Sequence, residues 1–143
     1  MIIREIRKQD LPAVAAIEER QTRDGWTRGM LASELAAAGC VRLLAEEAGE
    51  VSGYIFCRYV AGEAEVLRLC VAESYRRQGI GDRLMSAALQ RLALRGSLTF
   101  FLEVRRSNIA ARRLYDAHGF VDVGLRRHYY RGPREDGVIM RKR

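Results

Sequence analysis

The sequence lacks the features that anchor or cross-link many proteins. Its 143 residues include two prolines and three cysteines, and no apolar run is long enough to span a bilayer. The N-terminus has no apolar signal-peptide core, and Cys40, Cys57 and Cys70 lack metal-ligand spacing. We therefore expect a single domain over residues 1–143 in the cytoplasm, with reduced thiols, no membrane partner and no metal.

Lysine is almost absent, although the chain is basic. Lys8 and Lys142 are the only lysines among 25 basic side chains, and 18 acidic side chains leave a net charge of +7. Arginine makes planar, bidentate contacts with phosphate and carboxylate, so this composition favours an anionic ligand. The arginines occur in scattered pairs without a nucleic-acid-binding motif, which disfavours nucleic acid as the partner.

Apolar periodicity predicts an α/β fold with a mixed sheet and helices on both faces. Strands are expected at 2–7, 41–46, 51–59, 65–71, 99–104, 121–130 and 138–141. Helices are expected after the caps Asp10 and Thr27, over 80–94, and between the cap Asn108 and Gly119. The strand–helix–strand stretch from 65 to 104 should be a right-handed crossover, which makes its two strands parallel.

A glycine turn, Arg-Arg-Gln-Gly-Ile-Gly at residues 76–81, joins the strand 65–71 to the helix 80–94. Backbone N–H groups and the helix dipole make such a turn an anion site. A dinucleotide fingerprint needs a third glycine where Leu84 stands, and a Walker loop needs Gly-Lys-Ser/Thr. The remaining interpretation is a site for one diphosphate group, held by backbone amides from Gln78 to about Arg83.

Three segments of the chain carry a family resemblance. Residues 71–81, Val-Ala-Glu-Ser-Tyr-Arg-Arg-Gln-Gly-Ile-Gly, resemble the acyl-CoA pyrophosphate signature of the GNAT acetyltransferase superfamily. The residues from Leu102 to Phe120 are similar to the second half of that fold. The segment from Arg126 to Met140 resembles the ribosomal-protein-alanine N-acetyltransferase branch, whose members acetylate N-terminal α-amines of proteins.

The resemblance implies a fold and a cosubstrate. The implied fold is a mixed, mostly antiparallel seven-stranded sheet with a central, splayed parallel strand pair and about four helices on both faces. The implied cosubstrate is acetyl-CoA, with the pantetheine arm between the splayed strands. The residues expected to bind it are Leu69, Cys70, Val71, Arg76, Arg77, Gln78, Gly79, Ile80, Gly81, Asp82 and Asn108.

Glu103 and Tyr115 are the candidate catalytic residues. A free amine attacks a thioester only when it is deprotonated, and the departing thiolate needs a proton. Glu103 ends an apolar strand, where a half-buried carboxylate suits a general base. Tyr115 lies two turns into the next helix, and its phenol can point back toward the strand ends. The resemblance implies the same two roles at these two positions.

The amine acceptor stays open at this point. The branch implies a protein N-terminal α-amine, in that branch a ribosomal protein's, and the alternative is a lysine side chain or a small-molecule amine. The sequence departs from the family's pattern at Glu73, which replaces a proline. It also departs from the branch at Arg68, which replaces an asparagine, and at Asp24-Gly25-Trp26. The last two departures keep the alternative open.

Strand alternation makes two further predictions. Leu67, Leu69 and Val71 should share one face of their strand, and Val66, Cys70 and Ala72 the other. A covalent route through Cys70 is a minor alternative, because its side chain should face away from Leu69 and Val71. Tyr129 and Tyr130 should alternate, with one ring in the core and the other in the substrate groove.

Overall fold

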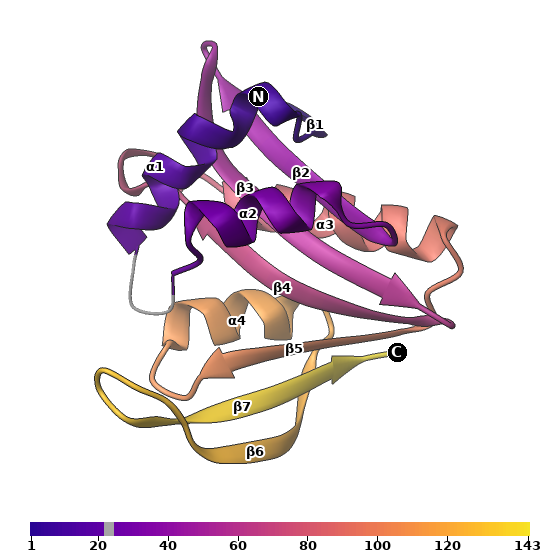
Figure 1. Ribbon diagram of the computed structural model, residues 1–143. Coiled ribbons are helices and arrows are strands. Elements are labelled where there is room, and N and C mark those ends of the chain that lie inside the picture. The colour runs from indigo at the N-terminus through magenta and orange to yellow at the C-terminus, as the bar shows by residue number, and fades with distance from the viewer. Residues whose placement is uncertain (22–24) are drawn as a thin grey trace.

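The computed structural model describes residues 1–21 and 25–143 (Figure 1). Its elements are β1 (Ile2–Glu5), α1 (Leu11–Gln21), α2 (Arg28–Ala36), β2 (Cys40–Glu47), β3 (Glu50–Val60), β4 (Glu63–Val71), α3 (Ile80–Leu94), β5 (Thr99–Arg105), α4 (Ile109–Ala117), β6 (Val121–Tyr130) and β7 (Glu135–Lys142). The predicted elements are confirmed, with ends that differ by a few residues. Asp24, part of one departure from the family's pattern, lies outside the described residues.

The described strands form one seven-stranded sheet in the order β1-β2-β3-β4-β5-β7-β6. Every neighbouring pair is antiparallel except β4 and β5. These two strands are joined through α3, as a parallel pair requires. The sheet therefore confirms the predicted mixed, mostly antiparallel topology with its parallel pair at the centre.

β4 and β5 pair only at their first residues. Their register runs from Glu63 opposite Thr99 to Val66 opposite Leu102. β4 continues to Val71 and β5 to Arg105, and no register in the described structure pairs these later residues of β4 with those of β5. The parallel pair is therefore splayed, as predicted, and both strands have free edges at the open end.

A bulge at Leu67 marks the start of this opening. In the pairing of β3 with β4, Phe56 opposes Arg68 and Cys57 opposes Val66, so Leu67 is the extra residue. The side chains toward α3 are Val66, Leu69 and Val71, and those toward α1 and α2 are Leu67, Cys70 and Ala72. The predicted grouping of Leu67 with Leu69 is wrong, because the extra residue reverses the alternation.

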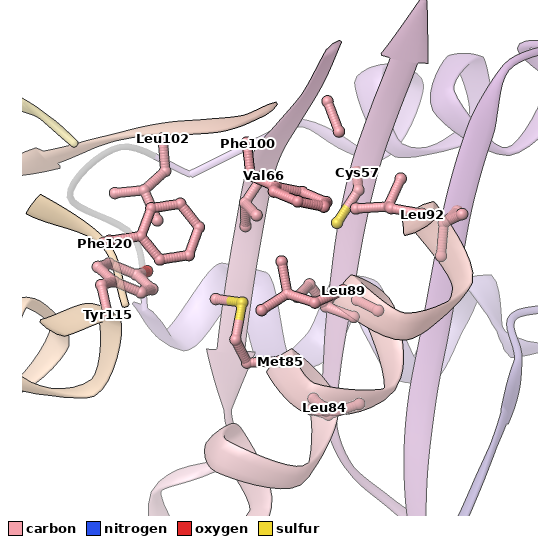
Figure 2. Packing of buried hydrophobic residues seen from close by; sticks show 14 of the residues in the cluster. Cys57, Val66, Leu84, Met85, Leu89, Leu92, Phe100, Leu102, Tyr115 and Phe120 are labelled. Carbon is pink, nitrogen blue, oxygen red and sulfur yellow. The ribbon is translucent and has the colours of Figure 1, made fainter. Parts of the chain in front are cut away.

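Helices cover both faces of the sheet, and each face has its own core. α3 buries a stripe of residues at helical spacing on one face, namely Ile80, Leu84, Ala88 and Leu92. Figure 2 shows Met85 and Leu89 of α3 beside Val66 and Phe100 of the parallel strands. On the other face, α1 and α2 bury Val14, Ile17 and Leu31. Within the described ranges, no helix is long and apolar enough to cross a membrane.

Both ends of α4 carry the predicted caps. Asn108 Oδ1 accepts a hydrogen bond from Ala111 N at 3.2 Å, and Gly119 takes a left-handed φ of 91° just beyond the helix. Phe120 N then donates to Tyr115 O at 3.1 Å. The two rings meet edge to face with centroids 6.1 Å apart (Figure 2). This C-terminal motif fixes Tyr115 against the sheet.

Candidate active site

A cleft of about 390 Å³ opens where β4 and β5 separate. It brings together four of the predicted site residues, which are Leu69, Glu103, Asn108 and Tyr115. These residues come from β4, β5 and α4, and from the cap before α4. The bulge, the splayed strands and the helix that returns beneath them therefore converge on one place.

The cleft is lined from both faces of the sheet. Leu102, Val104 and Tyr115 belong to the core beneath α3 and α4, whereas Leu67 and Trp26 belong with the core beneath α1 and α2. All five line the cleft. Two ligands that approach from opposite faces can therefore meet in the gap between the strands.

Glu103 stands on β5 with its side chain 17% exposed. Its Oε1 lies 2.9 Å from Nε of Arg126, whose guanidinium lies 5.1 Å from the ring centroid of Tyr129. The apolar run before Glu103 predicts apolar neighbours, and no local pattern signals Arg126, which β6 brings back across β7. The Glu103 carboxylate therefore lies at the cleft with an arginine as its ion-pair partner.

Glu65 of β4 is a second carboxylate on the cleft. Desolvation by the surrounding strands and the nearby charge of Glu103 raise the pKa of Glu65 above its ordinary value. Glu65 is not among the site residues predicted from sequence. No local sequence pattern marks it, because its place near Glu103 depends on the pairing of β4 with β5.

Tyr115 is 9% exposed and lines the floor of the cleft. Burial raises the pKa of its phenol well above the ordinary value, because the phenolate would lose its solvation. The hydroxyl therefore stays protonated near neutral pH. A protonated hydroxyl beside a reaction site is a proton donor.

We expect Tyr115→Phe to lower kcat about tenfold and to leave unchanged the affinity for acetyl-CoA, the cosubstrate that the resemblance implies. This fall in kcat is smaller than the usual contribution of a general acid, because a thiolate can leave without full protonation near neutral pH. Steady-state kinetics and a separate titration with acetyl-CoA measure the two effects. Tyr59→Phe is the matched control, because its hydroxyl accepts from Arg95 Nη1 at 3.0 Å outside the cleft. Unchanged kcat in Tyr115→Phe would remove the hydroxyl from the reaction.

The turn before α3 has the geometry of an anion site. Gly79 is the N-cap with a left-handed φ of 77°, and Arg77 before it has a φ of 64°. Arg83 N donates to Gly79 O at 3.1 Å, so the N–H groups of residues 80–82 have no partner inside the helix. A Cβ built on Gly79 would meet no atom within 4 Å. The space in front of these N–H groups is therefore open.

Two charged side chains of the predicted cofactor set have partners of their own. Arg76 Nε donates to Val71 O at 3.2 Å, and its Nη2 binds Gln21 Oε1. Asp82 Oδ1 lies 2.7 Å from His118 Nε2 at the end of α4. Asp82 can therefore reach an anion only through its backbone N–H. The described residues contain no group of three or more His, Cys, Asp or Glu that could hold a metal ion.

The other residues of the turn that were predicted to bind the cofactor differ in how exposed their side chains are. Arg77 and Gln78 are exposed. The Ile80 side chain is buried beneath the sheet at 1% exposure, so only its backbone is available to a ligand. A Cβ on Gly81 would stand 3.5 Å from Leu114 and 3.6 Å from Val71, in ordinary contact.

Cys70 faces away from the open space between the strands. Its Sγ lies 3.6 Å from Glu18 Oε1 beneath α1, and burial raises the pKa of the thiol to about 11. The predicted orientation of Cys70, opposite to Leu69 and Val71, is confirmed. A buried thiol with this pKa is a poor nucleophile near neutral pH, which disfavours the covalent route. Only its backbone can take part in cofactor binding.

Tyr129 and Tyr130 both line the cleft, so the predicted alternation is wrong. Their rings stand edge to face with centroids 5.0 Å apart. The register of β6 with β7 shifts between Arg126 and Tyr130, and His128 takes a left-handed φ of 54°. This irregularity turns both side chains toward the cleft.

A buried ion pair borders the cleft, and sequence analysis missed it. Glu18 is 1% exposed and accepts hydrogen bonds from Arg68 Nε at 2.6 Å, Arg68 Nη2 at 2.9 Å and Tyr54 Oη at 2.6 Å. Burial alone would raise the pKa of Glu18, but these bonds outweigh it and hold the pKa below its ordinary value. In α1, Glu18 lies at helical spacing from the apolar residues Val14 and Ala15, on the same buried face. A charged residue on a buried helix face is the sequence signal that could have revealed a buried ion pair.

Comparison with known proteins points to one family. Residues 3–120 match the model of the acetyltransferase (GNAT) family. The chain is 32% identical over 142 residues to the [ribosomal protein bS18]-alanine N-acetyltransferase of Haemophilus ducreyi, covering 97% of each chain. It is 34% identical over 140 residues to the enzyme of that name from Escherichia coli, covering 96% of this chain and 94% of the relative.

A solved structure has the same fold. The crystal structure of the ribosomal-protein-S18-alanine N-acetyltransferase from Escherichia coli superposes with a TM-score of 0.93 at 33% identity. The match covers 99% of this chain and 92% of that chain. The likeness therefore extends over the cleft as well as the sheet.

Proposed function

The chain belongs to the GNAT acetyltransferase family and is an acetyl-CoA-dependent N-acetyltransferase, and we propose that its acceptor is the N-terminal α-amine of a protein. Residues 1–143 act as one domain, and the acceptor is of the ribosomal-protein-alanine type. The observation that carries this proposal is the cleft at the open end of β4 and β5, which is lined from both faces of the sheet. The names of the relatives support the choice of acceptor.

The proposed acetyl-CoA site runs from the N-terminus of α3 into the cleft. The free N–H groups of residues 80–82 and the helix dipole favour a diphosphate at the open space before Gly79. The free edge of β4, with Leu69 and Val71, offers backbone groups to an extended arm. Asn108 uses its Oδ1 for the helix cap, which leaves its amide N–H groups for the same arm.

The proposed reaction is a direct transfer. Glu103 takes a proton from the incoming ammonium group, and the neutral nitrogen attacks the thioester carbonyl carbon. The C–N bond forms and the C–S bond breaks, while the hydroxyl of Tyr115 gives its proton to the departing sulfur. The nitrogen releases its second proton to solvent as the amide forms, solvent returns a proton to the Tyr115 phenolate, and Glu103 gives its proton up to solvent. Backbone N–H groups on the free edge of β4 stabilise the charge that develops on the carbonyl oxygen. No covalent bond to the enzyme is required.

Transfer of labelled acetyl groups to a panel of acceptors tests this proposal. The panel contains peptides with free N-terminal alanine or serine, the same peptides with blocked N-termini and an internal lysine, and small amines. We expect labelling of the free N-terminal peptides at a kcat/KM about tenfold or more above that of the other acceptors. Preference for the lysine peptides or for the small amines would establish the alternative acceptor instead.

A further inference from the structure

The guanidinium of Arg68 has one nitrogen left over from its ion pair. Glu18 takes hydrogen bonds from Nε and Nη2, and no hydrogen bond of Nη1 occurs among the described residues. Every buried side-chain nitrogen and oxygen in those ranges has a partner, so Nη1 is in contact with solvent. The space that Arg68 borders is the cleft, together with Glu103 and Tyr115. Nη1 is therefore a donor available to a ligand there.

The position of this donor is tightly fixed. Glu18 is held by Tyr54 Oη on β3 and by Trp26 N at 3.0 Å, besides its two bonds to Arg68. Trp26 packs edge to face on Phe56 with ring centroids 5.4 Å apart, and it lines the cleft itself. The planar guanidinium thus has its orientation set by a buried carboxylate rather than by solvent.

The ion pair also sets the charge that a ligand meets. A free arginine would repel an ammonium group, whereas Arg68 is neutralised by the buried carboxylate of Glu18. The pair therefore offers an N–H donor without a net positive charge. Such a donor suits a neutral acceptor oxygen close to a charged amine.

We propose that Arg68 determines acceptor specificity by donating a hydrogen bond from Nη1 to the first carbonyl oxygen of the acceptor. An N-terminal α-amine carries this carbonyl on its own Cα, whereas a lysine ε-amine or a simple alkylamine has no oxygen near its nitrogen. The contact therefore selects peptide N-termini over other amines. This inference rests on the proposed function and names the residue that enforces it.

The test compares two substrates and three enzymes. One substrate is a peptide that begins with alanine, and the other has an (E)-alkene in place of its first peptide bond. The enzymes are the wild type, the double variant Glu18→Gln/Arg68→Met, which removes the pair without stranding a buried charge, and Arg4→Met. Arg4, on the edge strand β1, is the control, because it is also an arginine paired with carboxylates, those of Asp10 and Glu46, and does not line the cleft.

The quantity compared is the kcat/KM for the carbonyl peptide divided by the kcat/KM for the alkene peptide. We expect this ratio to be about tenfold larger in the wild type and in Arg4→Met than in the double variant. The KM for acetyl-CoA should be unchanged in all three. Intrinsic differences in reactivity between the two substrate amines cancel when these ratios are compared, because every enzyme is measured with the same two substrates. A preference of equal size in the double variant and the wild type would overturn the role of Arg68, even if the peptide is a good substrate.

A second pair of substrates separates this inference from the proposed function. Alaninamide and 2-aminopropane differ in the same carbonyl but are not peptides. If the wild type acetylates no peptide, the proposed function fails, and the inference stands only if the preference for alaninamide is lost in the double variant. A wild type that acetylates neither pair contradicts both.

Discussion

Replacing Glu103 with glutamine is expected to lower kcat about 100-fold near neutral pH. Glutamine keeps the shape of the side chain and its place beside Arg126, but it cannot take a proton from the ammonium group. Affinity for acetyl-CoA should stay near that of the wild type, because the proposed diphosphate site at the start of α3 uses backbone N–H groups and not Glu103. Steady-state kinetics and direct titration with acetyl-CoA measure the two quantities.

The pH dependence of this variant separates a base from a structural carboxylate. A peptide α-amine loses its own proton as the pH rises from about 7 to about 9. The deficit of Glu103→Gln should therefore shrink across this range, since solvent performs the deprotonation. Glu63→Gln, at the paired end of β4, is the control and should behave as the wild type. A deficit that is constant with pH would exclude Glu103 as the base.

Replacing Gly79 with tryptophan is expected to weaken acetyl-CoA binding about 100-fold or more. The side chain would project into the open space before the free N–H groups of α3, and a diphosphate that loses two such charge-assisted bonds loses about that much affinity. The effect should be seen in titration with acetyl-CoA and with CoA alone, since both carry the diphosphate.

The control for this variant is Gly49→Trp in the turn between β2 and β3. Gly49 also has a left-handed φ, 81°, and open space around its Cβ position. Both substitutions carry the same backbone cost of about 1–2 kcal/mol for an L-residue in that conformation, so comparison of the two removes any general loss of stability. If Gly79→Trp binds acetyl-CoA as Gly49→Trp does, the diphosphate does not lie at this turn.

The parts of the fold that could be predicted from sequence are those governed by local signals. The limits of α3, Ile80–Leu94, follow from its apolar stripe and the glycine turn. The caps of α4 follow from Asn108 and Gly119 in the same way. The parallel pairing of β4 with β5 follows from the handedness of the crossover.

The features that sequence could not supply depend on pairing between distant strands. The extra residue at Leu67 is visible only in the register of β3 with β4. The irregularity that turns Tyr129 and Tyr130 to the same side depends on β7 in the same way. Alternation along a single strand cannot reveal an extra residue in its register. The facing predicted for Leu67 and Val66 and the alternation predicted for Tyr129 and Tyr130 were therefore wrong, whereas the facing predicted for Cys70 was right.

The charged partners in the site were missed for a related reason. Arg126 reaches Glu103 because β7 places β6 near β5, and Glu18 reaches Arg68 across 50 residues of sequence. In the sequence, Arg68 stands out only as a departure from the family's pattern. Its partner gives that departure a physical meaning, because a half-buried arginine is stabilised by a carboxylate beside it.

The most direct test of the central claim uses one peptide that carries both kinds of amine. The peptide begins with alanine and contains an internal lysine, and it is incubated with enzyme and acetyl-CoA under single-turnover conditions. Fragmentation in a mass spectrometer then locates the acetyl group. The account predicts acetylation at the N-terminal nitrogen with the lysine unmodified, and acetylation of the lysine with a free N-terminus would contradict it.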